Sequence, residues 1–269
     1  MLGAIIGDIV GSRFEWNNFK SKEFEFFAKN CFFTDDTVMT IAIGQALLAC
    51  DGQYDRLGPR AVKAMREIGQ NYPLCGYGGR FRTWLYSKDP QPYNSFGNGA
   101  AMRVSPCGLV AKSLEETKLL ARLVTEVTHN HPEGLKGAEA TATCVFLAKT
   151  GWDKLAIYDY VRQNYYPLDF DLDSIRLTYK FNETCQETVP QALEAFFESQ
   201  SFEDAIRGAI SIGGDSDTLG AITGGVAGAY YGIPKDFAQT AMTYLDDQLT
   251  KLLYYFVSVY IPKLPNAPE

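Results

Sequence analysis

The strongest constraint on the fold is a pair of aspartates inside a strongly apolar stretch, residues 212–220. Four polar residues stand together there after two glycines: Asp215, Ser216, Asp217 and Thr218. No lysine or arginine lies between Arg207 and Lys235, and a run of small apolar residues follows. Because a buried carboxylate is costly unless a positive charge pairs with it, the fold has to bring a cationic side chain or a metal ion to this stretch.

A second stretch, residues 33–37, carries the same chemistry far upstream. Its polar residues are Thr34, Asp35, Asp36 and Thr37, and an apolar run again follows. Oxygen ligands without cysteine or histidine suit hard cations such as Mg²⁺, Mn²⁺ or Ca²⁺. Four aspartates carry more negative charge than one divalent ion needs, which favours two ions. The two stretches together predict one shared metal site with these ligands: Thr34, Asp35, Asp36, Asp215, Asp217 and Thr218.

Either cluster alone also suits the first turn of a helix. Thr34 is a good N-cap, and Asp35 and Asp36 interact favourably with the helix dipole. Asp215 and Asp217 are expected in the turn that precedes a helix starting near Thr218. Two such clusters, both with apolar flanks, favour a metal site over capping alone.

Hydrophobic periodicity predicts helices throughout the chain. The expected ranges are 2–12, 34–50, 57–70, 81–86, 113–130, 135–149, 152–164, 187–199, 202–212, 218–231 and 236–260. No stretch alternates β-branched residues as a strand would, so we expect an all-α fold of roughly ten or more helices. Residues 2–7 and 219–224 have similar sequences and are predicted to pack against each other. Residues 168–177 are expected to be a polar linker, and residues 19–30 a surface loop.

Both aspartate clusters must meet, so we expect a single domain over residues 1–269; a domain break near 165–180 is the alternative. The formal net charge is 25 − 32 = −7, which argues against broad binding to nucleic acids or acidic membranes. The six cysteines show no paired metal spacing and are expected to be reduced thiols. With no recognisable signal peptide or membrane span in the sequence, we expect a cytoplasmic monomer.

Four motifs occur in one order along the chain. They are residues 7–15, 33–37, 97–103 and 213–232. In this order and at this spacing the sequence resembles the ADP-ribosylglycohydrolase family, and the resemblance extends from Gly3 to about Pro234. It implies a single compact multi-helix domain of the ADP-ribosylglycohydrolase type. It also implies a hydrolase that uses two Mg²⁺ or Mn²⁺ ions to cleave the glycosidic bond between ADP-ribose and an acceptor, such as a protein arginine.

The sequence alone leaves the roles of three further features open. Glu15 lies between Phe14 and Trp16, a setting that raises a carboxyl pKa, but it also reads as an ordinary loop glutamate. The glycine-rich segment 88–99 suits a phosphate or sugar site or a plain connector. The two histidines, His129 and His131, lack a third soft ligand for zinc and suit a polar loop.

In the family, Glu15 corresponds to the mobile catalytic glutamate, the segment ending at Gly99 cradles ADP-ribose, and His129 contacts the substrate. The resemblance thus makes Glu15, Asp36 and Asp217 catalytic. The expected substrate contacts are Ser95, Phe96, Gly97, Asn98, Gly99 and His129, with Phe96 stacking on the adenine. The expected partners are ADP-ribose and an ADP-ribosylated substrate, which we expect to be a protein.

Two other classes of function stay open. The first is a hydrolase of free ADP-ribose derivatives or of an ADP-ribosylated nucleobase. The second is an inactive module that only binds ADP-ribose. The intact carboxylates at 15, 35, 36, 215 and 217 argue against the inactive module.

Overall fold

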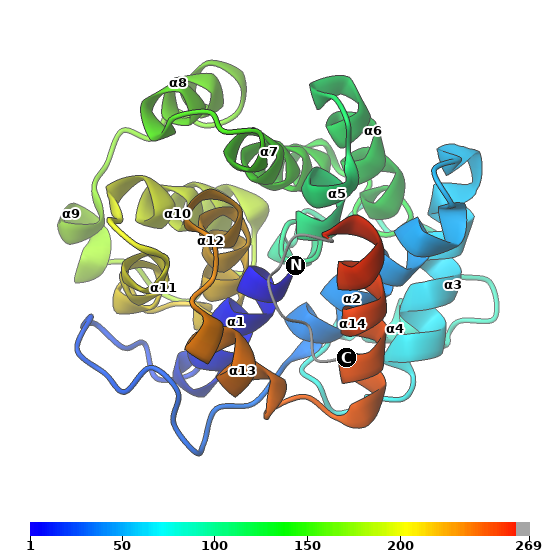
Figure 1. The fold of residues 1–269 in the computed structure, drawn as a ribbon, viewed down its shortest axis with the longest axis horizontal. Helices are drawn as coiled ribbons and strands as arrows, with labels where there is room; N and C mark the ends of the chain where they lie inside the picture. The colour runs from blue at the N-terminus through cyan, green and yellow to red at the C-terminus, as the bar shows by residue number, and fades with distance from the viewer. Residues whose placement is uncertain (262–269) are drawn as a thin grey trace.

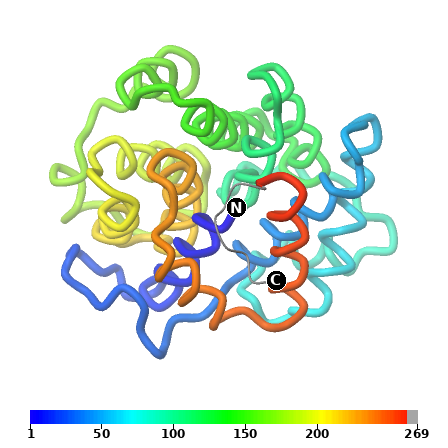
Figure 2. The backbone as a smooth tube through the Cα atoms, in the orientation of Figure 1, coloured from blue at the N-terminus to red at the C-terminus, as the bar shows by residue number. Residues whose placement is uncertain are grey.

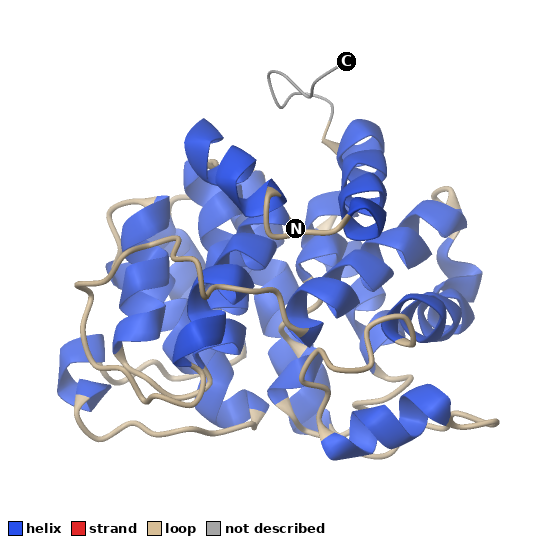
Figure 3. Ribbon diagram, turned by 90° about the horizontal axis from the view of Figure 1, so that it is seen from below, coloured by secondary structure: helices blue, strands red, loops and turns tan. Residues whose placement is uncertain are grey.

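The computed structural model describes residues 1–261, and this part of the chain is entirely helical apart from loops (Figures 1 and 3). Three short 3-10 helices are η1 (Ser12–Phe14), η2 (Tyr54–Arg56) and η3 (Asn98–Ala100). The fourteen α-helices of the described residues are α1 (Leu2–Gly11), α2 (Asp35–Cys50), α3 (Leu57–Gly69), α4 (Gly79–Tyr86), α5 (Ser105–Val110), α6 (Leu114–Thr125), α7 (Pro132–Lys149), α8 (Lys154–Asn164), α9 (Leu172–Arg176), α10 (Cys185–Glu198), α11 (Phe202–Ser211), α12 (Ser216–Tyr231), α13 (Lys235–Met242) and α14 (Asp247–Tyr260).

The all-α fold predicted from the sequence is confirmed. The buried side chains of the described residues form one contiguous core, to which helices from both halves of the chain contribute. The expected domain boundary at residue 269 falls outside the described residues.

The centre of the fold is an antiparallel pair, α1 and α12, whose backbones lie in contact (Figure 1). A Cβ atom built on Gly7 would lie 1.8 Å from the carbonyl oxygen of Gly220, and one on Gly3 would lie 2.2 Å from that of Gly224. Only glycine permits so close an approach at these positions. The predicted contact between residues 2–7 and 219–224 is therefore confirmed.

This pairing brings the end of α1 to the start of α12. A Cβ atom on Gly11 would lie 2.3 Å from the carbonyl oxygen of Ser216, the first residue of α12. Helix α2 also contacts α1, and its start lies beside the same end, because Asp8 of α1 accepts from the N–H groups of Thr34 and Thr37. Three chain segments that carry carboxylates thus meet at one point.

The remaining helices enclose this central group. Helix α12 also contacts α7, α10 and α11, whereas α2 contacts α3 and α14. Figure 2 shows the long segment between α1 and α2 following one edge of the molecule. The described helices include none long and apolar enough to cross a membrane, and all six cysteines are unpaired.

Two expectations about secondary structure were wrong. The predicted helix 236–260 is two helices, α13 and α14, because residues 243–246 form a turn in which Asp246 caps α14 by accepting from the N–H of Leu249. The expected linker 168–177 contains the short helix α9 and buries Leu172. In both cases a local cap or the tertiary contacts of apolar side chains overrode the sequence pattern. Residues 19–30 form a loop as expected, and this loop also buries Phe26, whose ring stacks on Phe237.

Candidate active site

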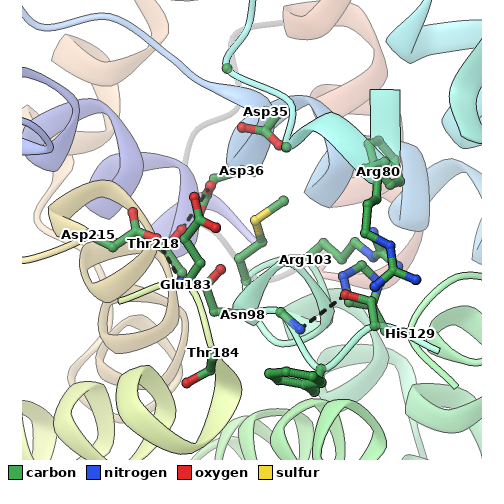
Figure 4. A pocket seen from close by; sticks show the side chains of 18 of the residues that line it. Asp35, Asp36, Arg80, Asn98, Arg103, His129, Glu183, Thr184, Asp215 and Thr218 are labelled. Atoms are coloured by element: carbon green, nitrogen blue, oxygen red, sulfur yellow. Dashed lines mark hydrogen bonds between the residues drawn. The ribbon is translucent and has the colours of Figure 1, made fainter. Parts of the chain in front are cut away.

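A cavity of about 310 Å³ opens where the ends of α1, α2 and α12 meet. Three further segments complete its walls, at residues 76–80, 93–99 and 181–184. All the site residues expected from the sequence line this cavity except Thr34. Figure 4 shows Asp36, Asp215, Thr218 and Glu183 on one side, and Arg80, Arg103 and His129 on the other.

The start of α12 is shaped by two glycines with positive φ, Gly213 at 68° and Gly214 at 77°. Asp215 follows at the N-cap position but makes no side-chain capping bond. Its Oδ2 instead accepts a hydrogen bond of 2.7 Å from Nδ2 of Asn98. The carboxylate of Asp215 is thus held toward the cavity and does not serve the helix end. Asp217 lies inside the first turn of α12, whereas the sequence had placed it in the preceding turn.

Asp36 connects the two polar clusters. Its Oδ2 accepts a hydrogen bond of 3.3 Å from Oγ1 of Thr218, which joins α2 to α12. Thr34 is the N-cap of α2, as its sequence suggested, and accepts from the N–H of Asp36. Thr34 does not line the cavity, and its hydroxyl donates to Oδ1 of Asp8 at 2.7 Å. Of the predicted metal ligands, Thr34 is therefore the one already engaged as a structural cap.

Two buried carboxylate oxygens of this site have no hydrogen-bond partner within residues 1–261: Oδ1 of Asp36 and Oδ1 of Asp217. Carboxylate oxygens of Glu15, Asp215 and Asp217 also lie within 4.8 Å of one another. None of these carboxylates forms an ion pair within residues 1–261. Unpartnered oxygens that converge without a cationic side chain fit a bound divalent cation.

The buried acids perturb one another. Burial, together with the charges of Asp217 and Asp8, raises the pKa of Asp36 well above its usual range. Burial, together with the charge of Asp215, raises the pKa of Asp217 in the same direction. A nearby cation would reverse these shifts because it stabilises the charged form of each carboxyl.

Glu15 directly follows η1, at the end of the central helix pair. Burial, followed by the charges of Asp217, Asp8 and Glu183, raises its pKa to about 8. The hydrophobic setting predicted from Phe14 and Trp16 is only part of this effect, since the neighbouring carboxylates contribute as well. A carboxyl group with such a pKa can accept or hold a proton near neutral pH.

Asp8 is a site residue to which the sequence reasoning gave no role. It is fully buried on α1, and its carboxylate accepts from the N–H groups of Thr34 and Thr37, each at 3.0 Å, and from both hydroxyls. Asp8 thus fixes the first turn of α2, which carries Asp35 and Asp36. Its signal in the sequence was a single charge inside an otherwise apolar helix.

The opposite side of the cavity is cationic. Arg103 is 1% exposed and donates to Oγ1 of Thr128 at 2.6 Å. Arg80 donates to the carbonyl oxygen of Tyr93, and its guanidinium lies 5.0 Å from the centre of that ring. Burial, followed by the charges of Arg103 and Arg80, lowers the pKa of His129 well below its usual value, so its imidazole is neutral. The sequence reasoning did not single out either arginine.

The predicted substrate loop is tied to residues 183–185. The N–H of Asn98 donates to the carbonyl oxygen of Glu183 at 2.7 Å, and the N–H of Cys185 donates to that of Phe96 at 2.9 Å. Asn98 is buried, and its backbone N–H and its side-chain Nδ2 both donate to other groups of the protein. Phe96 is 40% exposed beside the cavity, with its ring centre 5.1 Å from that of His131. Asn98 therefore supports the site, while Phe96 remains open to a ligand.

Comparison with known proteins gives a consistent result. The family profile described as ADP-ribosylglycohydrolase matches residues 1–259. ADP-ribosylhydrolase ARH3 of Mus musculus is 26% identical, covering 89% of this chain and 85% of its own. The ADP-ribosylarginine hydrolase Tri1 of Pseudomonas putida is 24% identical, covering 87% and 70%. A solved structure titled ADP-ribosylglycohydrolase-related protein complex superposes with a TM-score of 0.67 at 25% identity, over 95% of this chain and 96% of that one.

Proposed function

Since the chain belongs to the ADP-ribosylglycohydrolase family, we propose that it hydrolyses the glycosidic bond between ADP-ribose and a modified protein side chain. The observation that carries this proposal is the cavity with one acidic and one cationic side, lined by residues from all four sequence motifs. The relatives named for action on ADP-ribosylated substrates support the same class of reaction. Arginine is the acceptor we favour.

The acidic side suits two Mg²⁺ or Mn²⁺ ions, which Asp35, Asp36, Asp215, Asp217 and Thr218 would hold, with Thr34 supporting Asp36. The unpartnered oxygens of Asp36 and Asp217 are the observation behind this assignment. When bound, such ions supply a template for the ribose hydroxyls and a lower pKa for an attacking water. Asp8 and Asn98 orient the ligands, since one fixes the first turn of α2 and the other holds Asp215.

Glu15 is the group we assign to proton transfer. Its carboxyl lies beside Asp215 and Asp217, and its raised pKa suits a general base or acid at neutral pH. Cleavage breaks the bond between the ribose anomeric carbon and the acceptor through a transition state with oxocarbenium character. Glu15 takes a proton from the attacking water, and the electron pair of the broken C–N bond goes to the acceptor nitrogen. The protonated guanidinium thus leaves as a neutral guanidine, which takes the proton back from Glu15.

The cationic side suits the diphosphate. Arg80 and Arg103 provide positive charge, and the glycines of the loops at 76–79 and 97–99 let a ligand approach the backbone closely. Ser95 and His129 lie on this loop surface, and the exposed ring of Phe96 is placed to stack on the adenine. Binding energy from these remote contacts helps to position the reacting bond. Unchanged affinity for ADP-ribose in a Phe96→Ala variant would contradict the stacking role.

The proposal is tested by release of ADP-ribose from arginine-linked and serine-linked ADP-ribosylated peptides. We expect turnover with Mg²⁺ or Mn²⁺ and none after chelation, with recovery when either ion is restored. Asp36→Ala and Asp217→Ala should abolish turnover and weaken metal binding measured by calorimetry. Asp236→Ala, an exposed aspartate in the first turn of α13, is the matched control. Full activity in a metal-free preparation would refute the metal site, and no turnover on any linkage would refute the proposed reaction.

A further inference from the structure

An exposed tryptophan stands beside the proposed proton-transfer residue. Trp16 directly follows Glu15 and is 76% exposed. Its ring stacks on Phe181, with ring centres 4.9 Å apart and planes inclined by 21°. Phe181 itself lines the cavity. The pair thus presents an apolar surface next to Glu15, with Phe181 on the cavity wall and the exposed Trp16 just outside it.

A carboxylate completes this surface. Glu183 lies two residues after Phe181, is exposed and lines the cavity. It forms no ion pair within the described part of the chain. Glu15 lines the same cavity. In Figure 4 it is on the side of Asp36 and Asp215 and away from Arg80.

The segment that carries Phe181 and Glu183 is held in place by backbone contacts. The carbonyl oxygen of Glu183 accepts from the N–H of Asn98, and Gly97 forms a β-bridge with Thr184. The stacked pair and its carboxylate are therefore fixed relative to the loop proposed to hold ADP-ribose. If the diphosphate lies at the cationic side and the ribose lies at the aspartates, the acceptor leaves from this end.

We propose that Trp16, Phe181 and Glu183 form the binding site of the acceptor side chain and select a cationic acceptor, the guanidinium of arginine. This inference rests on the proposed function, whose glycosidic bond lies between ADP-ribose and the acceptor. A planar guanidinium stacks well on an aromatic face and forms two parallel hydrogen bonds to a carboxylate. A neutral hydroxyl acceptor such as serine uses neither contact.

A purely structural role makes a different prediction. If the Trp16–Phe181 stack only held Glu15 in place, its loss would slow hydrolysis of every linkage equally, and Glu183 would not matter. If these residues instead bind the acceptor, their substitution raises KM, and the size of the increase depends on whether the peptide is linked through arginine or serine. The experiment therefore compares two peptides of the same sequence, one ADP-ribosylated on arginine and one on serine.

In the hydrolysis assay, Glu183→Gln and Trp16→Ala should each raise KM for the arginine-linked peptide by about fivefold or more, with a smaller change in kcat. The change in KM for the serine-linked peptide should be much smaller. Glu187→Gln, an exposed glutamate four residues further on and outside the cavity, is the matched control. Equal effects on both peptides, or no effect on the arginine-linked one, would overturn the acceptor site.

A binding measurement tests the site independently of turnover. Agmatine, which carries a guanidinium, is titrated into the wild-type protein saturated with ADP-ribose while tryptophan fluorescence is recorded. We expect a saturable change that is lost in Trp16→Phe, is retained in Trp152→Phe, and has a Kd about fivefold higher in Glu183→Gln. The absence of any response to agmatine would overturn the inference. A response in a protein that hydrolyses neither peptide would refute the proposed function alone.

Discussion

At the scale of single residues, the site is defined by carboxylates that the protein buries without cationic partners. Within the described part of the chain, Asp36 and Asp217 each leave one buried oxygen without a hydrogen bond, and Asp215 is held by the amide of Asn98. Leaving such groups unpaired costs free energy in the empty protein. This cost is offset where a cation binds, so the same residues that destabilise the fold carry the proposed chemistry.

Glu15 gives the sharpest prediction at this scale. Glu15→Gln keeps the shape of the side chain and removes its capacity to accept a proton. We expect kcat to fall by about 10²-fold or more, as is typical when a general base is lost, with affinity for ADP-ribose largely retained. Steady-state kinetics and calorimetry on the same preparation provide the two readouts.

The control for this variant is Glu23→Gln, an exposed glutamate of the same loop. Normal turnover in Glu15→Gln would move the base to one of the aspartates. Joint loss of metal and ADP-ribose binding would make Glu15 a ligand instead.

At the scale of elements, the contact between α1 and α12 decides the geometry of the site. Glycines on facing turns bring the two backbones together, and this places Glu15 beside Asp215 and Asp217. Helix α2 is then fixed to α1 by Asp8, which binds its first turn. The spacing of glycines along two helices thus determines where Glu15 meets the aspartates of α12 and its N-cap, and Asp8 brings those of α2 to the same place.

We predict that Gly7→Ala lowers the free energy of unfolding by about 1–3 kcal/mol or more, because the added methyl group forces the helices apart. Its Cβ would lie 1.8 Å from the carbonyl oxygen of Gly220 in α12. This oxygen belongs to the helix backbone and cannot move aside as the end of a flexible side chain could. Denaturant unfolding measures the change, and turnover per folded molecule should fall with it.

Gly58→Ala in α3 is the matched control, since its Cβ would meet atoms no nearer than 3.4 Å and helices favour alanine over glycine. This variant should be neutral or slightly more stable. Similar stability for Gly7→Ala and Gly58→Ala would show that the close helix contact is not important for folding.

At the scale of the whole molecule, the acidic site links stability to pH and metal. Burial raises the pKa of Asp8 and of Asp215 to about 6, and the pKa of Glu15 reaches about 8. A raised carboxyl pKa stabilises the fold below the ordinary value near 4, and this stabilisation is lost as pH rises through the raised value. A bound cation prevents the loss because it pairs with the deprotonated groups.

We therefore predict that the increase in Tm caused by Mg²⁺ or Mn²⁺ over chelator grows between about pH 5 and pH 8. The difference in Tm between metal and chelator is used because it cancels the contribution of groups whose pKa is lowered in the fold, such as His129. Thermal unfolding across this range, with and without metal, measures it. Asp36→Asn combined with Asp217→Asn should remove most of the increase. A metal effect that is constant or shrinks as pH rises would contradict the prediction.

The sequence by itself determined the helical class, the two polar clusters and the contact of residues 2–7 with 219–224. These follow from local periodicity and from residue types whose chemistry is unusual in an apolar setting. It also identified Glu15 and the loop around Asn98, through resemblance to a family. All of these features are written into short stretches of chain.

Only the tertiary structure decided which groups face one another. It gave Asp8 its role at the start of α2, turned the donors of Asn98 inward to Asp215 and Glu183, and placed Arg80 and Arg103 opposite the acids. It also stacked Trp16 on Phe181, which lies far along the chain. The physical reason is that a side chain's partner, burial and pKa depend on distances between segments remote in sequence, and these distances are set by the packing of the helices.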